Sequence, residues 1–168
     1  GIMLYGISPL PEFQRLLKPA LTWKTRIGLI RDMPQGHGIS YGRTFITPRP
    51  MRVATLSAGY ADGYPRSASA SDNKSQAIVG GQRCPVVGHP SMDLLAIDVT
   101  DISDLSVVRR GKMVTLIGPE FTIDDLSAAS ESTGPDITPS RQSLQATPAW
   151  KSSSRKRSRR FCTCSVTK

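Results

Sequence analysis

Turn signals recur about every eight to twelve residues through the first 130 residues of this chain, and they leave room only for short elements. Asp62 and Gly63 form one such signal, and Gly80 and Gly81 form another. The runs between the turns alternate apolar and polar residues, most regularly over residues 21–33. A period of two predicts a strand with one buried face. Many short strands joined by turns predict a mainly β fold, a small barrel or sandwich.

The other elements follow from the same signals. A helix is expected at 122–130, because Thr122 and Asp125 have the spacing of a capping box. Prolines bracket residues 12–18, so this segment can form only a short helix. Further strands are predicted at 51–60, 75–88 (as a hairpin), 91–102 and 112–118.

The pattern fails after residue 130. Residues 131–168 are rich in Ser, Pro, Thr and Arg and cannot bury enough apolar area to offset the entropy of ordering, so we predict a disordered tail. This tail is also basic: residues 1–128 hold 14 basic and 11 acidic residues, whereas residues 129–168 hold 8 and 2. The net charge of +9 therefore belongs mostly to the tail and not to the predicted β domain at 20–130.

Composition also limits the functional class. No apolar run reaches about 18 residues, so no membrane span is expected. The N-terminus, which begins at Gly1, has neither the basic start nor the cleavage site of a signal peptide, and we expect a cytoplasmic protein. Three scattered cysteines fit a reducing compartment. Cys162 and Cys164 have no histidine nearby, so we expect no metal site.

Several motifs stand in one order and spacing over roughly residues 1–128, and together they resemble the C-terminal part of bacterial alanine racemases. The resemblance implies an isomerase that interconverts L- and D-alanine, a peptidoglycan precursor, by two-base proton transfer with pyridoxal 5'-phosphate. It also implies a homodimer in which one subunit's α/β barrel meets the other's β domain. Residues 1–19 would then be the end of the barrel and a linker. The motifs are GIMLYGISP, LKPALTWKTRI, ISYGRTF, VATLSAGYADGYPR, GGQRCPVVGHPSMDLLAIDVTDI and VTLIG.

The same resemblance implies a role for each matching residue. Tyr41 would be one of two opposed bases. Tyrosine has an ordinary pKa of about 10, so a basic tyrosine needs positive charge or hydrogen bonds that favour the phenolate. The backbone N–H of Met92 would bind the substrate carboxylate. The remaining matches are Tyr60 and Arg66 on the substrate access path, Asp93 as a support of that path, and Gly1 and Ile2 as backbone donors to the cofactor phosphate.

The chain departs from the family pattern in three respects. His89, which we also expect to contact the substrate, stands where the family usually has arginine, so a positive charge there depends on pH. Pro90 replaces a small residue and stiffens the segment. The usual C-terminal tyrosine motif is missing, and a shift of reading frame would account for its loss. Because the cofactor lysine would lie before Gly1, we expect an incomplete enzyme that is inactive alone.

Three alternatives remain open from the residues. One alternative interprets Tyr41 as a half-buried strand residue at a hairpin end. The basic segment 151–160 could bind nucleic-acid phosphates without sequence preference, although it lacks interleaved aromatic residues, and nucleic acid is not the favoured partner. A hydrolase would need a Ser–His–acid set, and no G-x-S-x-G elbow is present. The candidates for that set are Ser40 or Ser91, His37 or His89, and Asp62 or Asp93.

Overall fold

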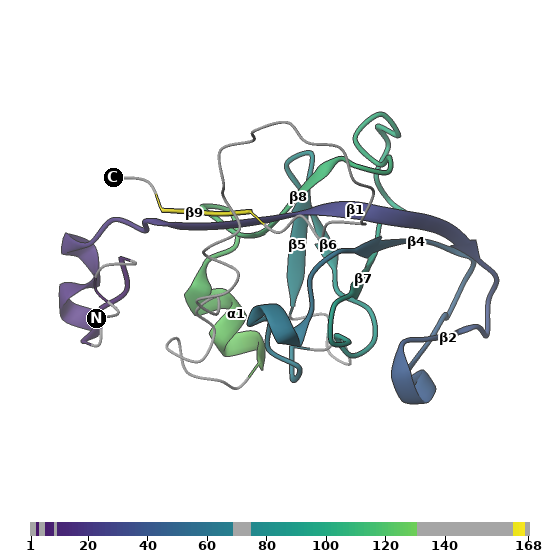
Figure 1. Ribbon diagram of the computed structural model, residues 1–168, viewed down its shortest axis with the longest axis horizontal. Coiled ribbons are helices and arrows are strands. Elements are labelled where there is room, and N and C mark those ends of the chain that lie inside the picture. Colours follow the sequence, from purple (N-terminus) through teal and green to yellow (C-terminus); the bar gives the residue numbers. More distant parts are fainter. Residues whose placement is uncertain (1–2, 4–5, 9, 69–74, 131–162, 167–168) are drawn as a thin grey trace, which may run out of the picture.

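Strand β1, Leu21–Met33, is the central strand of the fold (Figure 1). The computed structural model describes residues 3, 6–8, 10–68, 75–130 and 163–166. Leu21, Trp23, Thr25 and Ile27 are buried in alternation, which confirms the predicted period of two and its boundaries. The N-terminal half of β1 pairs with β8, and its C-terminal half pairs with β4, both antiparallel.

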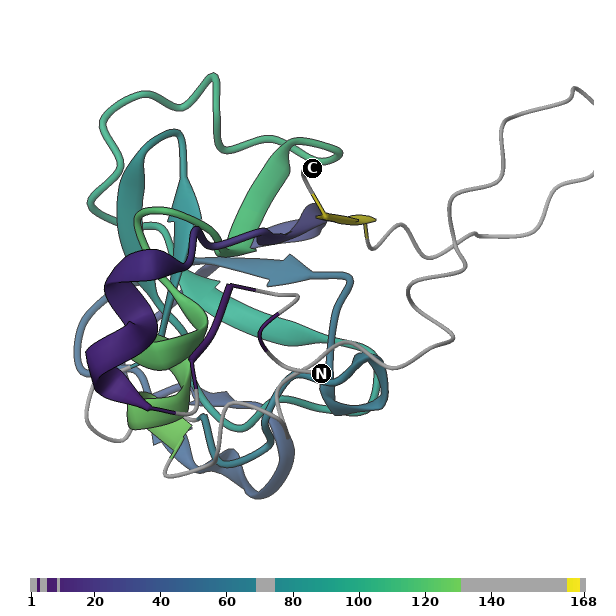
Figure 2. The ribbon, with the colours of Figure 1, turned by 90° about the vertical axis from the view of Figure 1, so that its left-hand side faces the viewer.

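The main sheet has seven antiparallel strands in the order β6-β5-β8-β1-β4-β7, with β9 pairing separately with β1. Seen from the side in Figure 2, the strands curl around a common interior. The mainly β fold is therefore confirmed. Besides β1, the strands are β4 (Met51–Leu56), β5 (Gln76–Val79), β6 (Gln82–Pro85), β7 (Leu95–Asp98), β8 (Met113–Ile117) and β9 (Thr163–Val166).

Two predicted strands are shorter than expected. β4 ends at Leu56, not at residue 60, and β7 begins only at Leu95, not at residue 91. In both cases the missing residues form loops that hydrogen-bond to each other: the Tyr60 N–H donates to the Ser91 carbonyl over 3.0 Å. Loop-to-loop bonds thus replace the strand ladder at this end of the sheet.

A second, two-stranded sheet consists of β2 (Gly38–Ile39) and β3 (Phe45–Ile46), joined by a 3-10 turn, η3 (Tyr41–Arg43). Two other 3-10 segments are η2 (Pro11–Leu16) and η4 (Tyr60–Asp62). A small apolar cluster of Ile39, Met51, Val53 and Val87 lies beneath the β2–β3 unit. This cluster attaches β2 to the main sheet.

Helix α1, Ile123–Ser130, begins at the predicted capping box. The Thr122 N–H donates to the Asp125 carboxylate over 2.7 Å, and the Asp125 N–H donates to Thr122 Oγ1 over 3.2 Å. Ile123 and Leu126 are buried in the main core, so α1 covers one end of the sheet (Figure 1). No helix in the described ranges has the length and apolar character of a membrane span.

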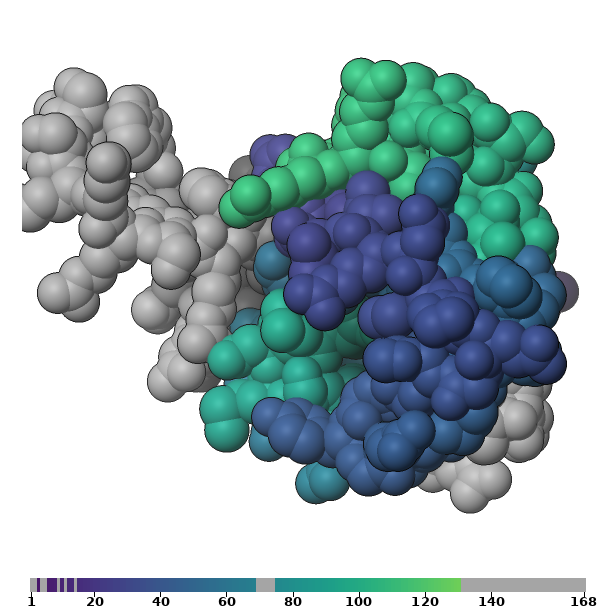
Figure 3. All heavy atoms as spheres, turned by 90° about the vertical axis from the view of Figure 1, so that its right-hand side faces the viewer, coloured from purple at the N-terminus to yellow at the C-terminus, as the bar shows by residue number. Residues whose placement is uncertain are grey.

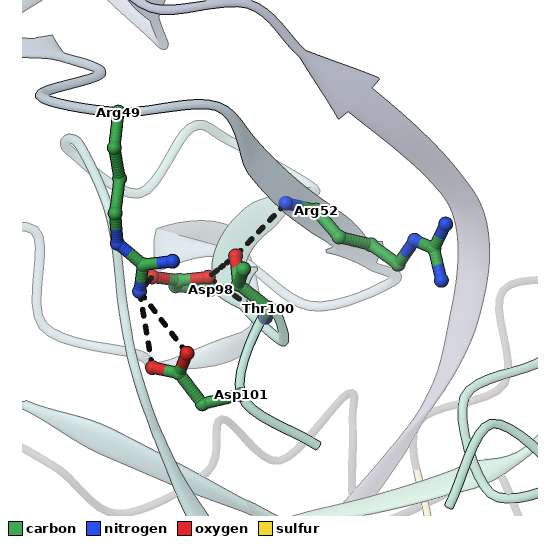
Figure 4. A network of polar contacts seen from close by, with 5 residues as sticks. All are labelled: Arg49, Arg52, Asp98, Thr100 and Asp101. Carbon is green, nitrogen blue, oxygen red and sulfur yellow. Dashed lines mark hydrogen bonds and ion pairs between the residues drawn. The ribbon is translucent and has the colours of Figure 1, made fainter. Parts of the chain in front are cut away.

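A polar network fastens the start of β4 to the end of β7 (Figure 4). The Arg49 guanidinium lies 3.0 Å from the Asp101 carboxylate and 3.8 Å from that of Asp98. Thr100 Oγ1 accepts the Arg52 N–H over 2.9 Å, and the Thr100 N–H donates to Asp98 over 2.9 Å. These contacts bring the β7 end against the strand beside it.

Four residues of the segment predicted to be a disordered tail form a strand in the structure. Thr163–Val166 forms β9, antiparallel to β1, with Val166 opposite Leu21 and Thr163 opposite Lys24. This part of β1 lies before the residues that pair with β4, so its edge can accept another strand, and Thr and Val suit a strand. Residues 131–162 and 167–168, including the basic segment 151–160, lie outside the described residues.

Candidate functional site

The segment ISYGRTF presents Tyr41 to solvent. Tyr41 begins the η3 turn between β2 and β3, and 74% of its surface is exposed. The alternative of a half-buried strand tyrosine is therefore wrong. The turn forms because the β2–β3 hairpin pairs Ile39 with Phe45, which leaves the residues between them to reverse the chain. A phenol in this position can reach a group outside the domain.

The residues before and after Tyr41 have unusual backbone angles. Ser40 has φ 67° and ψ −179°, and Arg43 has φ 49°, although neither is glycine. The Ser40 hydroxyl donates to the His89 carbonyl. Sequence reasoning missed this contact, because no local signal marks a serine for positive φ or links it to a loop far along the chain.

The GYADGYPR motif packs its first half directly on the Met92 segment. The Tyr60 and Ala61 N–H groups donate to the carbonyls of Ser91 and Met92, each over 3.0 Å. A Cβ on Gly59 would lie 2.2 Å from the Ser91 oxygen, so only glycine allows this approach. Two loops predicted to carry site residues therefore lie against each other.

The two tyrosines of that motif have opposite environments. Tyr60 is 40% exposed, and the Arg66 guanidinium lies over its ring, 5.8 Å from the centroid. Tyr64 is buried, lies 6.0 Å from Trp23 in an edge-to-face pair, and shares a 2.6 Å hydrogen bond with Ser75. Burial raises the pKa of Tyr64 far above its ordinary value. Tyr64 is thus a core residue, whereas Tyr60 can contact a ligand.

Four of the predicted site residues meet at one pocket of about 250 Å³: Tyr41, Tyr60, Arg66 and His89, with Pro90 completing the lining. They come from the η3 turn, the β4–β5 connection and the β6–β7 connection. Within the described part of the chain, His89 Nδ1 is buried and has no hydrogen-bond partner. The pocket thus combines two phenols, a guanidinium and an imidazole.

Met92 lies beside this pocket but does not line it. Its carbonyl accepts the Ala61 N–H, its side chain is 55% exposed, and its own N–H has no hydrogen-bond partner among the described residues. Gly1 and Ile2, predicted to bind the cofactor phosphate, lie outside the described residues.

A wider groove of about 440 Å³ adjoins the pocket, and Tyr41 and His89 line both. Figure 3 shows this face, which is hollowed between β1 and the segments that surround it. The groove includes apolar side chains of β1 and the β7 region, such as Leu29 and Leu94, which are about half exposed. An exposed apolar surface beside a polar pocket is typical of an interface.

The hydrolase alternative finds no support. The Ser40 hydroxyl donates to the His89 carbonyl and not to an imidazole, and the Ser91 hydroxyl donates to the Leu94 carbonyl over 2.9 Å. A serine nucleophile needs a base that accepts its proton. The described residues also contain no group of three or more His, Cys, Asp or Glu side chains that could hold a metal ion.

Sequence comparisons give one consistent match. The family described as "Alanine racemase, C-terminal domain" matches residues 20–143. The alanine racemase of Methylacidiphilum infernorum is 44% identical over 138 residues, which are 82% of this chain and 35% of that protein. The alanine racemase of Halothermothrix orenii is 49% identical over 124 residues, 73% of this chain and 31% of that protein. The chain therefore spans about a third of the length of these relatives.

Solved structures agree. The biosynthetic alanine racemase of Pseudomonas aeruginosa superposes with a TM-score of 0.72 at 38% identity, over 82% of this chain and 37% of that one. The alanine racemase of Bartonella henselae, solved with covalently bound pyridoxal phosphate, gives 0.69 at 34% identity, over 82% and 37%. Motifs, fold and comparisons thus agree, and the chain belongs to the alanine racemase C-terminal domain family.

Proposed function

We propose that this chain is the β domain of an alanine racemase and supplies Tyr41 as one of two opposed proton-transfer groups. The observation that carries the proposal is the exposed Tyr41 phenol at a pocket shared with Tyr60, Arg66 and His89. Racemisation requires removal of the α-proton from one face of the substrate and its return to the other face. A phenol that points out of its own domain suits a substrate held by a different surface.

Pyridoxal 5'-phosphate, when bound, would stabilise the carbanion that proton removal creates. The residues present fit a supporting role toward this group, because they bring two phenols, a guanidinium and an imidazole to one pocket. Tyr41 would take or return a proton at its Oη atom. Arg66 contributes its guanidinium to the same pocket and lies over the ring of Tyr60.

The Met92 N–H would bind the substrate carboxylate. The Ser91 and Met92 carbonyls both accept hydrogen bonds, whereas the Met92 N–H has no partner among the described residues, so this N–H is available to donate to an anion. Tyr60, Arg66, His89 and Pro90 would line the access path of the substrate. Alanine is the substrate that the family relationship supports.

A barrel-bearing chain would complete the site. The groove beside Tyr41 exposes Leu29 and Leu94 next to the polar pocket, so an interface at this face would bring Tyr41 to a site on the other chain. The family's homodimer is the assembly that we propose. Alone, the 168-residue chain should neither racemise alanine nor show the visible absorbance of bound pyridoxal phosphate.

The test is a grafted enzyme, in which the whole chain 1–168 follows the N-terminal barrel of the Methylacidiphilum infernorum relative. The graft should racemise alanine, and Tyr41→Phe should lower kcat by roughly 10²- to 10⁴-fold, the usual effect of removing an acid–base group. Tyr64→Phe is the matched control, since this tyrosine is buried away from the pocket. If the kcat of the Tyr41→Phe graft stays within threefold of that of the parent graft, Tyr41 is not a proton-transfer group.

A further inference from the structure

We propose that Ser40 is a positioning residue: its strained backbone and its hydrogen bond to the His89 carbonyl together hold the Tyr41 turn at the pocket. The inference rests on the proposed role of Tyr41 and assigns a function to a residue that has no other part in the chemistry. Three structural observations carry it: the backbone angles of Ser40, the contacts that enforce them, and the exposure of the turn itself.

The backbone of Ser40 lies in a region that is essentially restricted to glycine. Its φ of 67° and ψ of −179° bring Cβ into conflict with the backbone, and such angles persist only where the surroundings enforce them. Arg43, at φ 49°, is the other non-glycine residue with positive φ in the described chain. The two flank Tyr41 and Gly42, so the unusual angles are concentrated on this turn.

The β6–β7 connection enforces the angles of Ser40. The Ser40 hydroxyl donates to the His89 carbonyl, and the space beside Gly88 is so narrow that an added Cβ would lie 2.8 Å from Ser40 Cβ. This connection is itself fixed to the sheet, because the Val87 N–H donates to the Ala96 carbonyl over 2.8 Å. We call the contacts among Ser40, Gly88 and His89 the clamp. Because the clamp is bonded to β7 through Val87, the turn is held at a fixed position relative to β7.

The β2–β3 pairing and the burial of Ile39 hold the base of the hairpin, whereas Tyr41 at its tip is 74% exposed. The three residues of η3 are all exposed, and a backbone hydrogen bond closes the turn from the Arg43 N–H to the Ser40 carbonyl over 3.2 Å. The same clamp sets the position of His89, whose side chain lines the pocket together with Tyr41. The Ser40 hydrogen bond therefore joins the two segments that carry Tyr41 and His89 directly, and proton transfer is sensitive to the spacing of such groups.

The first arm of the test uses the full 168-residue chain and does not depend on catalysis. Ser40→Ala removes the hydroxyl but keeps the Cβ conflict, whereas Ser40→Gly removes both. Ser67→Ala is the matched control, because the Ser67 hydroxyl also donates to a carbonyl, that of Ser130, over 2.7 Å, away from the turn. In Ser40→Ala the Arg43 amide should exchange with deuterium about fivefold faster or more, since its acceptor is then no longer held. Unchanged exchange would overturn the proposal.

The second arm uses the grafted enzyme. Ser40→Ala should lower kcat by roughly tenfold to a hundredfold, as expected for a displaced reacting group, and Ser40→Gly should recover part of the loss because glycine accepts the angles without strain. With α-deuterated alanine, the isotope effect should increase for only one enantiomer, the one whose proton Tyr41 removes. A merely structural role would lower kcat without that asymmetry.

The outcomes separate this inference from the proposed function. If Tyr41→Phe leaves the graft active, the proposed function fails, and the exchange arm still decides whether the clamp exists. If Tyr41→Phe inactivates the graft but Ser40→Ala stays within twofold of the parent, the positioning role is wrong. An equal loss in Ser40→Ala and Ser40→Gly with unchanged isotope effects would also overturn it.

Discussion

Replacement of Gly59 by alanine should destabilise the domain more than any ordinary glycine-to-alanine change. Gly59 does not have positive φ, so the effect is purely one of space. The new Cβ would lie 2.2 Å from the Ser91 oxygen and 2.5 Å from the Met92 oxygen, whereas real Cβ contacts stay beyond 3.0 Å. The two loops must therefore move apart by close to 1 Å.

That movement weakens both inter-loop hydrogen bonds, from Tyr60 to Ser91 and from Ala61 to Met92, each 3.0 Å long. At about 1 kcal/mol for each of the two bonds, with about 1–3 kcal/mol for overpacking, the free energy of unfolding should fall by about 3–5 kcal/mol. The assay is urea unfolding of the full chain, with the midpoint and slope compared between variants.

Gly28→Ala is the control for this measurement. Its Cβ would meet the Ser57 hydroxyl at 3.4 Å, an ordinary contact, and the backbone of Gly28 is not in the left-handed region. It should change the free energy of unfolding by less than about 1 kcal/mol. If Gly59→Ala is as mild as Gly28→Ala, the two loops are not held together as the structure describes.

Two further predictions concern the core and the sheet surface. Tyr64→Phe leaves the buried Ser75 hydroxyl without its 2.6 Å partner and should lower the free energy of unfolding by about 1–2 kcal/mol; a neutral change would argue against that bond. The hydrogen bond from Arg52, helped by its charge, lowers the pKa of Asp32 below its ordinary 3.8. The pair therefore stabilises the fold above about pH 4, and this contribution is lost as the pH falls through the lowered pKa. The difference in unfolding free energy between the parent and Asp32→Asn should shrink in acid and in high salt, and a difference that grows in acid would contradict the pairing.

The local elements of this protein could be predicted from neighbouring residues. The alternation in residues 21–33 determines β1, Gly80 and Gly81 determine the β5–β6 turn, and the Thr122–Asp125 spacing determines the start of α1. Each of these signals acts over a few residues, so no knowledge of the fold is needed. The motifs likewise predict Tyr41 as a site residue without reference to its exposure.

The arrangement of the site was decided by tertiary structure alone. Nothing in the sequence indicates that β4 ends early and β7 begins late so that the adjoining loops can pair. Nor does it indicate that Ser40 adopts a glycine-like backbone against Gly88 and His89. The unfavourable angles of Ser40 contradict its local preference and are maintained by contacts with a distant loop. The backbone preference of a residue depends on its neighbours in the sequence. The contacts that override it at Ser40 exist only after the sheet has brought the two loops together.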